Sequence, residues 1–255
     1  MTLAIRKQLQ QRSIPEVSFG PFHLLEALPW LVLAAALRVI AFGGGWIALP
    51  ATIVANIAVL HAFLVVAQRS IELAGGHTAL GELGSGEQFR LSLSVLWRIT
   101  LLMIAGALAT WAAGYGPLAP HLMSGLDGMA FDQFTDSGKF WSAAIAALVL
   151  LMLVDSERHD GQVSLFRAAG EFIRRGLWIV PTVIALGIVY LGLGLGQGWV
   201  RSAIWNFWQV SSSSQFIKNL IYFVFIFSFA MLRLWITLTV LTFGLKQSYV
   251  HGNGA

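Results

Sequence analysis

The sequence predicts an all-α polytopic membrane protein, a bundle of about six transmembrane helices with two cytoplasmic amphipathic elbow helices and both termini in the cytoplasm. Hydrophobic residues make up 57% of the 255 residues and charged residues only 11%. So few polar side chains could not cover the core of a soluble protein. The apolar residues also form continuous runs of about 16 to 29 residues, without the alternation of a membrane β-barrel. Since hydrocarbon requires every backbone polar group to be paired internally, such runs predict helices.

Six apolar runs are long enough, or nearly so, to cross the hydrocarbon core as helices. The expected spans are about Phe22 to Phe42, Trp46 to Gln68, Ile99 to Tyr115, Lys139 to Val154, Gly176 to Leu195 and Ile217 to Leu245. They leave a cytoplasmic segment over residues 1–20, a membrane domain over residues 21–246 and a cytoplasmic tail over residues 247–255. The fourth run is short, so a re-entrant segment is the alternative there. The triplet Gly43-Gly44-Gly45 predicts a tight turn between the first two spans.

The distribution of lysine and arginine predicts the orientation. With the N-terminus in the cytoplasm, the inner segments carry eleven of these residues and the outer segments three. Cytoplasmic loops of membrane proteins collect lysine and arginine, so this orientation is favoured over its reverse. The net charge of +4 is therefore attributed to membrane topology, and no nucleic-acid partner is expected.

Two of the expected cytoplasmic connectors resemble each other. Phe89-Arg90 and Phe166-Arg167 lie 77 residues apart, and in each connector an arginine follows nine residues after the phenylalanine. Ser85 and Gln88 have capping-box spacing at the start of the first connector. A repeated unit of span, elbow and span is one interpretation, and a chance match is the other. The arginines of the two elbows are Arg90, Arg98, Arg167, Arg174 and Arg175.

The second elbow predicts a helix that lies in the membrane interface. Its apolar residues share one helical face, and most of its charged residues lie on the other. Pairs at i,i+4 are expected between Arg167 and Glu171 and between Glu171 and Arg175. We expect the apolar face in the acyl boundary and the basic face toward anionic head groups.

Arg233 lies well inside the last apolar run. A charge at that depth costs at least ~2.5–3.5 kcal/mol, so it should face protein or water and have a partner. By depth, the candidate partners are Glu26 and His61. One hypothesis is a polar cavity of these three residues that is open to the cytoplasm and binds an anion or a lipid head group. The alternative is a contact between helices that fixes their packing.

Other polar residues of the expected spans have simpler interpretations. Asn56 is expected to donate a hydrogen bond between helices. Arg38 lies near the outer end of the first span and is expected to snorkel toward the interface. Haem ligation by His61 would need a second histidine at the same depth, which the sequence does not offer.

An aromatic segment over residues 196–216 is expected as a loop on the outer face, and it carries Trp199, Trp205 and Trp208. Tryptophan concentrates at the membrane–water interface because its ring is amphipathic. A short helix lying on that face is one interpretation, and a surface that docks a partner or lipid is the other.

The sequence offers no recognisable catalytic set. It contains no cysteine, which excludes disulfides, thiolate metal sites and a cysteine nucleophile. It also lacks the zinc-protease, serine-hydrolase and P-loop signatures. No metal, cofactor or catalytic residue is therefore predicted.

The second connector carries a resemblance. Its acidic residues after a span, Asp155 and Glu157, precede an amphipathic helix that ends in Arg175-Gly176 before the next span. Over about Lys139 to Leu195 this pattern resembles a loose group of uncharacterised bacterial six-helix membrane proteins. That group includes the membrane domain attached to some glycerophosphodiester phosphodiesterases. The resemblance implies a six-helix fold in the bacterial cytoplasmic (inner) membrane, and it carries over no functional residues.

Three functions follow as hypotheses. The first is a non-enzymatic accessory or scaffold protein that binds membrane lipids, above all anionic head groups at the cytoplasmic face, or a partner membrane protein or second copy. The second is a transporter or permease component for a small solute or lipid, which predicts a water-accessible cavity around Arg233. Ala168-Ala169 followed by Val180-Pro181 is faintly similar to the coupling loop of ABC importer permeases, and a transporter of that type would need a separate ATPase. The third is a lipid-modifying membrane enzyme, which would need an acid/base pair.

Overall fold

The computed structural model describes residues 24–42, 44–73, 84–112, 136–159 and 161–252. In this part of the chain every regular element is an α-helix. The helices are α2 (Leu24–Phe42), α3 (Ala48–Leu73), α4 (Ser85–Ala112), α6 (Asp136–Arg158), α7 (Leu165–Arg174), α8 (Gly176–Val210) and α9 (Gln215–Gly252). The all-α prediction is confirmed for these residues.

Five of the described helices are long and apolar enough to cross a membrane: α2, α3, α6, α8 and α9. Only about a third of the span windows in α8 and α9 is buried within the protein. Large apolar side chains such as Leu195 and Phe216 are exposed along these helices. Such surfaces suit contact with lipid rather than water, and together with the helix lengths they indicate a multi-pass membrane protein.

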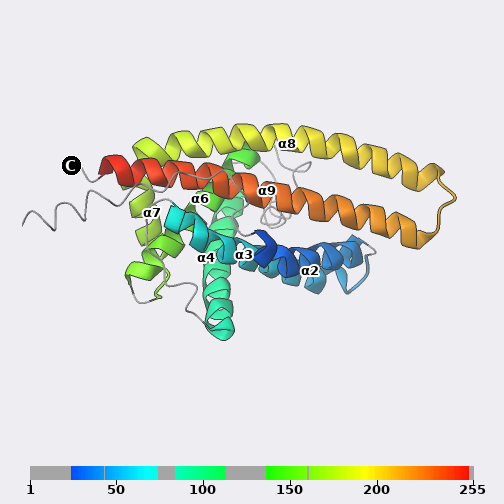
Figure 1. Ribbon diagram of the computed structural model, residues 1–255, viewed down its shortest axis with the longest axis horizontal. Coiled ribbons are helices and arrows are strands. Elements are labelled where there is room, and N and C mark those ends of the chain that lie inside the picture. The colour runs from blue at the N-terminus through cyan, green and yellow to red at the C-terminus, as the bar shows by residue number, and fades with distance from the viewer. Residues whose placement is uncertain (1–23, 43, 74–83, 113–135, 160, 253–255) are drawn as a thin grey trace, which may run out of the picture.

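Two helical hairpins run side by side (Figure 1). α8 and α9 form the longer hairpin, joined by residues 211–214, and α2 packs along α3 and against α9. Gly44 and Gly45 stand between α2 and α3 with φ of 76° and 79°. Only glycine adopts this backbone region without strain, so the predicted glycine turn is confirmed at these two residues.

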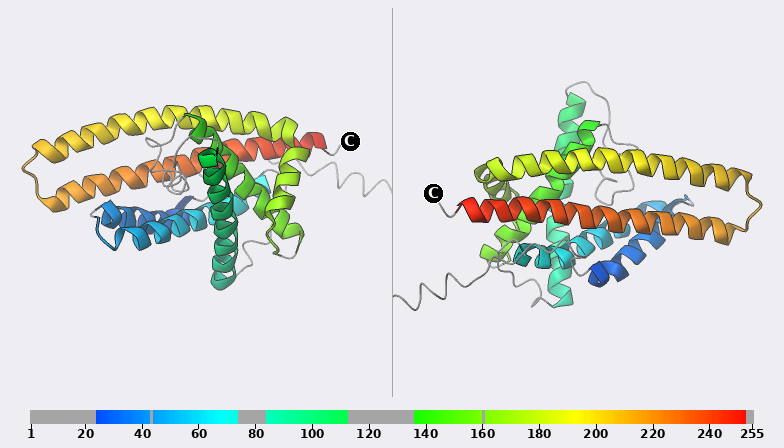
Figure 2. Two further views of the ribbon diagram at one scale, coloured as in Figure 1. Left: turned by 180° about the vertical axis from the view of Figure 1, so that it is seen from behind. Right: turned by 45° about the horizontal axis from the view of Figure 1, so that its top comes forward.

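The remaining helices cross or flank these hairpins. α6 packs on α8, α7 lies at the end of the bundle where α8 begins, and α4 crosses the long helices, as both views of Figure 2 show. One apolar core joins all seven described helices. Its buried members include Leu31, Ile71, Val95, Met152, Ala168, Leu186 and Leu238. On α8 the buried residues recur every three or four positions, so one stripe of the helix faces the bundle.

The first elbow is not a separate helix, which corrects the prediction of two elbow helices. α4 is continuous from Ser85 to Ala112, and the expected third span forms its second half and extends beyond the described residues. The helix is capped one residue earlier than predicted, because the backbone N–H of Gly84 donates to Glu87 Oε2 at 3.0 Å. Gly84 is thus the N-cap and Glu87 the third helical residue, where a carboxylate reaches back.

The aromatic segment is not a loop, which corrects a second prediction. α8 continues as far as Val210, and only residues 211–214 connect it to α9. The glycines between positions 192 and 198 do not break the helix, because in apolar surroundings the intrahelical bond is the only partner for each backbone group. All three tryptophans of the segment therefore lie on α8.

Candidate functional site

α7 is a ten-residue helix between two bundle helices. Ser164 is its N-cap, in extended conformation, and its side chain accepts from the backbone N–H of Arg167 at 3.4 Å. The helix ends at Arg174, Arg175 is its C-cap, and α8 begins at Gly176. A helix of this length cannot cross the hydrocarbon, so α7 is an elbow between α6 and α8.

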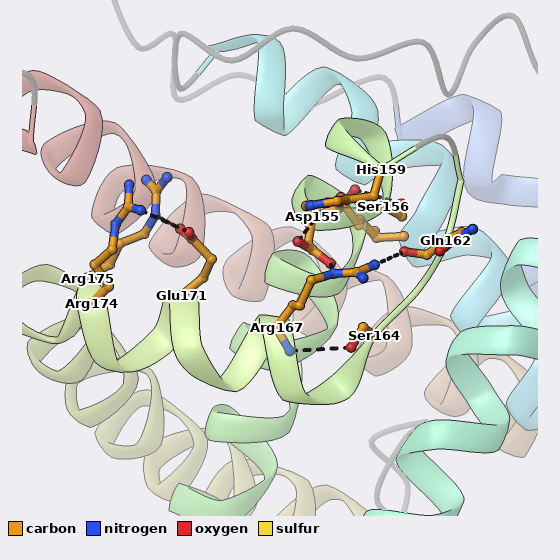
Figure 3. Close-up of polar contacts among 10 residues, drawn as sticks. Asp155, Ser156, His159, Gln162, Ser164, Arg167, Glu171, Arg174 and Arg175 are labelled. Carbon is orange, nitrogen blue, oxygen red and sulfur yellow. Dashed lines mark hydrogen bonds and ion pairs between the residues drawn. The ribbon is translucent and has the colours of Figure 1, made fainter.

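The N-terminal end of α7 is tied to α6 by a charged network (Figure 3). Arg167 Nε donates to Asp155 Oδ2 at 2.8 Å, and its Nη2 donates to the backbone carbonyl of Gln162 at 2.8 Å. Asp155 is buried, and its other oxygen lies 3.1 Å from His159 Nδ1. The i,i+4 spacing within α7 did not predict this acidic partner, because Asp155 is twelve residues earlier in the chain.

The C-terminal end of α7 is tied to α9. Arg175 Nε lies 2.8 Å from Glu171 Oε2, which confirms the predicted i,i+4 pair. Its Nη1 donates to Ser248 Oγ at 2.7 Å, and the guanidinium lies 4.8 Å from the ring centre of Tyr249. Arg167 and Arg175 therefore hold the elbow to the protein at its two ends.

Arg174 is placed differently. Its side chain is 73% exposed and lies 3.5 Å from Glu171 Oε1. Glu171 has the closer pair with Arg175, so Arg174 extends into the surroundings with a weaker tie to the protein. Among the three arginines of α7 and its C-cap, Arg174 is the one most available to an external anion.

The apolar face of α7 divides into two parts. Ala168 is buried, and Leu165 and Phe172 pack against the core. Phe166, Ile173 and Leu177 are instead 89%, 80% and 86% exposed. Phe166 and Ile173 are seven residues or about two turns apart, so they lie on one face of α7. Leu177 follows beyond the C-cap, in the first turn of α8. These three exposed side chains are called the stripe below.

The first elbow lacks this organisation. Arg90 is exposed on α4, and Arg98 Nη1 donates to the backbone carbonyl of Ser94 at 2.9 Å. The two basic connectors thus have different structures, one a turn of a continuous helix and one a separate elbow. The two connectors therefore do not share the helical structure that a repeated unit of span, elbow and span would give them.

Arg233 lies where α6, α8 and α9 meet. Its Nη2 donates to Ser142 Oγ at 2.6 Å, and its guanidinium lies 4.5 Å from the ring centre of Tyr190. The hydroxyl of Tyr190 lies 2.6 Å from Thr237 Oγ1. These contacts join three helices, which is the packing role considered for Arg233 from the sequence.

The other two residues of the predicted polar cluster have their own neighbours. His61 is buried, with its Nδ1 3.0 Å from Ser92 Oγ on α4 and its ring against Trp30 on α2. Glu26 lies exposed in the first turn of α2. A shared cavity of Glu26, His61 and Arg233 stays a prediction.

Arg38 and Asn56 form a contact that the sequence predicted in part. Arg38 Nη2 donates to Asn56 Oδ1 at 2.7 Å, which joins α2 to α3. The expected hydrogen bond between helices is confirmed for Asn56, but in this bond Asn56 is the acceptor and not the predicted donor. Arg38 was expected to snorkel, and the structure shows it directed to a neighbouring helix.

The three tryptophans of α8 also separate. Trp199 and Trp205 are exposed. The ring of Trp208 packs against Phe42 of α2 and Tyr222 of α9, and its backbone carbonyl accepts from Lys218 Nζ at 2.8 Å. Trp208 is thus part of the packing between the two hairpins.

No protein-family model, curated protein or solved structure matches the chain. Among the described residues, no three His, Cys, Asp or Glu side chains lie close enough together to hold a metal ion. α7 is therefore the candidate site, because it combines an exposed apolar stripe with an available cation.

Proposed function

We propose that the protein is a non-enzymatic accessory or scaffold protein of a membrane that binds lipid at the cytoplasmic face through α7. The observation that carries this proposal is the exposed stripe of Phe166, Ile173 and Leu177 beside the exposed Arg174. An amphipathic helix with apolar side chains on one face and cations beside it is the usual element for binding at a lipid interface.

The attachment of α7 supports a scaffold role. Both of its ends are fixed by ion pairs or hydrogen bonds to α6 and α9. A fixed helix presents its outward stripe without the entropic cost of folding on binding. Its position directly before the span α8 also suits a surface at the level of the head groups.

The proposed topology has six spans, both termini in the cytoplasm, and residence in a bacterial inner membrane. The lysine and arginine distribution supports this orientation. Single cysteines at positions 174 and 212 test it in whole cells, because the native chain has no cysteine. A membrane-impermeant thiol reagent should label position 212 and not position 174. The reverse pattern would contradict the orientation.

Affinity purification from the native membrane in a mild detergent, followed by mass spectrometry of proteins and lipids, tests the function. A retained lipid, or a membrane complex without an ATPase, is the expected result. A stoichiometric ATPase or solute-binding protein would overturn the accessory role and make the chain a transporter subunit.

A transporter would need Arg233 to be accessible from water. The contacts of Arg233 with Ser142 and Tyr190 support a packing role instead. A cysteine at position 233 or 61 distinguishes the two, since labelling by the impermeant reagent would support a cavity and protection at both would support packing.

A further inference from the structure

We propose that α7 lies in the cytoplasmic leaflet with Phe166, Ile173 and Leu177 among the acyl chains, and that Arg174 binds the phosphate of an anionic phospholipid. This inference rests on the proposed lipid-binding function and names its ligand and contact residues. It assigns different roles to arginines that the sequence grouped together.

The first step concerns the occupant of the stripe. Phe166, Ile173 and Leu177 stand out from the bundle on α7 and the first turn of α8. Leu177 continues into Val180, Ile184 and Ile188, which are also exposed and which follow α8 at helical spacing into its apolar span. Leu177 thus belongs to a surface that a spanning helix presents to lipid, and Phe166 and Ile173 are the exposed apolar residues that precede it on α7, so acyl chains are the occupant that fits the stripe.

The second step concerns the charge. Anionic phospholipids attract basic side chains that lie at the height of the head groups. Arg167 is held by Asp155 and the carbonyl of Gln162, and Arg175 by Glu171 and Ser248. Arg174 follows Ile173 directly and is largely exposed, so its guanidinium can reach a phosphate next to the inserted stripe. Guanidinium binds phosphate with two parallel hydrogen bonds.

The third step concerns Glu171, whose carboxylate would otherwise compete with a phosphate. Its shorter ion pair is with Arg175, at 2.8 Å, and its contact with Arg174 is 3.5 Å. Loss of the Arg174 side chain therefore leaves Glu171 paired, and an Arg174→Gln variant is expected to fold.

The test of position uses the full-length protein in nanodiscs of phosphatidylcholine with phosphatidylglycerol. Nitroxide labels are placed by Phe166→Cys or Ile173→Cys, with Gln162→Cys as the control in the exposed connector before α7. Spin labels at positions 166 and 173 should be more accessible to oxygen than to a water-soluble nickel chelate, and position 162 should show the opposite. Nickel accessibility at 166 and 173 equal to that at 162 would overturn the insertion of α7.

The test of the head group compares the lipid retained by purified variants in native mass spectrometry. Arg174→Gln should lower the retention of phosphatidylglycerol about fivefold, while phosphatidylcholine is unaffected. Arg174→Lys should keep most of it, and Arg201→Gln, the same change at an exposed site on α8, should change nothing. An equal loss of both lipids, or an equal effect of Arg201→Gln, would overturn the role of Arg174.

The two proposals can fail separately. If the nanodisc labels place α7 in water while the native purification still retains a lipid, the inference on α7 fails and the accessory function stands. If the purification yields a stoichiometric ATPase while the labels report insertion, the accessory function fails and α7 is the membrane-facing elbow of a transporter.

Discussion

The guanidinium of Arg167 lies 2.8 Å from the buried carboxylate of Asp155, and this pair connects the first turn of α7 to the last turn of α6. His159 completes the surroundings of the carboxylate at 3.1 Å. The pair gives α7 a fixed starting point after a connector that has no helical structure over residues 162–164.

Asp155→Asn should loosen α7 while the rest of the fold persists. The change removes the charge that holds Arg167, and loss of a charged hydrogen bond typically costs about 1–3 kcal/mol. Hydrogen exchange should rise in residues 162–175 and stay unchanged in α9. The double variant with Arg167→Gln should lose little more than either single variant. Fully additive losses would show that the two residues do not act together.

Gly187→Ala should destabilise the protein. A methyl group at this position would overlap the ring of Phe140 on α6, and overpacking typically costs about 1–3 kcal/mol. Gly192→Ala on the same helix is the matched control, because its methyl group would meet no atom within 4 Å. The thermal midpoint in detergent should fall for the first variant and hold or rise for the second. Equal midpoints would contradict the packing of α6 on α8.

Arg233→Gln should lower stability by about 2 kcal/mol, since it removes a charged hydrogen bond to Ser142 and the contact with Tyr190. Thr239→Ala on the same helix should have little effect, because the Thr239 hydroxyl donates to the backbone carbonyl of Trp235 on its own helix. Thermal unfolding in detergent measures both variants. An Arg233→Gln variant as stable as the native chain would argue against a packing role.

For the hydrogen-bonded pair of Arg38 and Asn56, removing one partner should destabilise the protein more than removing both. Asn56→Leu alone removes an acceptor from a charged donor, and this should cost about 1–3 kcal/mol. The double variant Arg38→Met with Asn56→Leu removes donor and acceptor together, so its thermal midpoint should recover toward that of the native chain. A double variant that is less stable than Asn56→Leu would contradict this expectation. It would show that the Arg38 side chain stabilises the protein by contacts other than its hydrogen bond to Asn56.

The periodicity and length of the apolar runs predicted much of the fold. The runs that became α2, α3, α6, α8 and α9 were recognisable because a span needs about 20 apolar residues whatever its neighbours are. Helix ends were harder to predict. α8 continues to Val210, and near this end Trp208 contacts Phe42 and Tyr222, which come from distant parts of the chain.

The sequence predicted which residues form the candidate site, but only some of the contacts that they make. Spacing along one helix is enough to predict the pair of Glu171 and Arg175. It cannot predict that Asp155 holds Arg167, or that Ser142 and Tyr190 surround Arg233, because those contacts depend on how helices pack. The exposure of Arg174 follows from the same packing.

The lengths of α8 and α9 have a consequence for how the protein stands in its bilayer. With 35 and 38 residues these helices are about 53 and 57 Å long, against a hydrocarbon thickness of about 30 Å. Even a tilt of about 40° would leave a vertical extent of about 40 Å, so tilting alone does not remove the mismatch. If α7 fixes one interface at the start of α8, the surplus accumulates at the opposite end, around residues 211–214. The hairpin tip then lies at the far head groups, where the exposed Trp199 and Trp205 suit the interface, and its height depends on the thickness of the surrounding membrane.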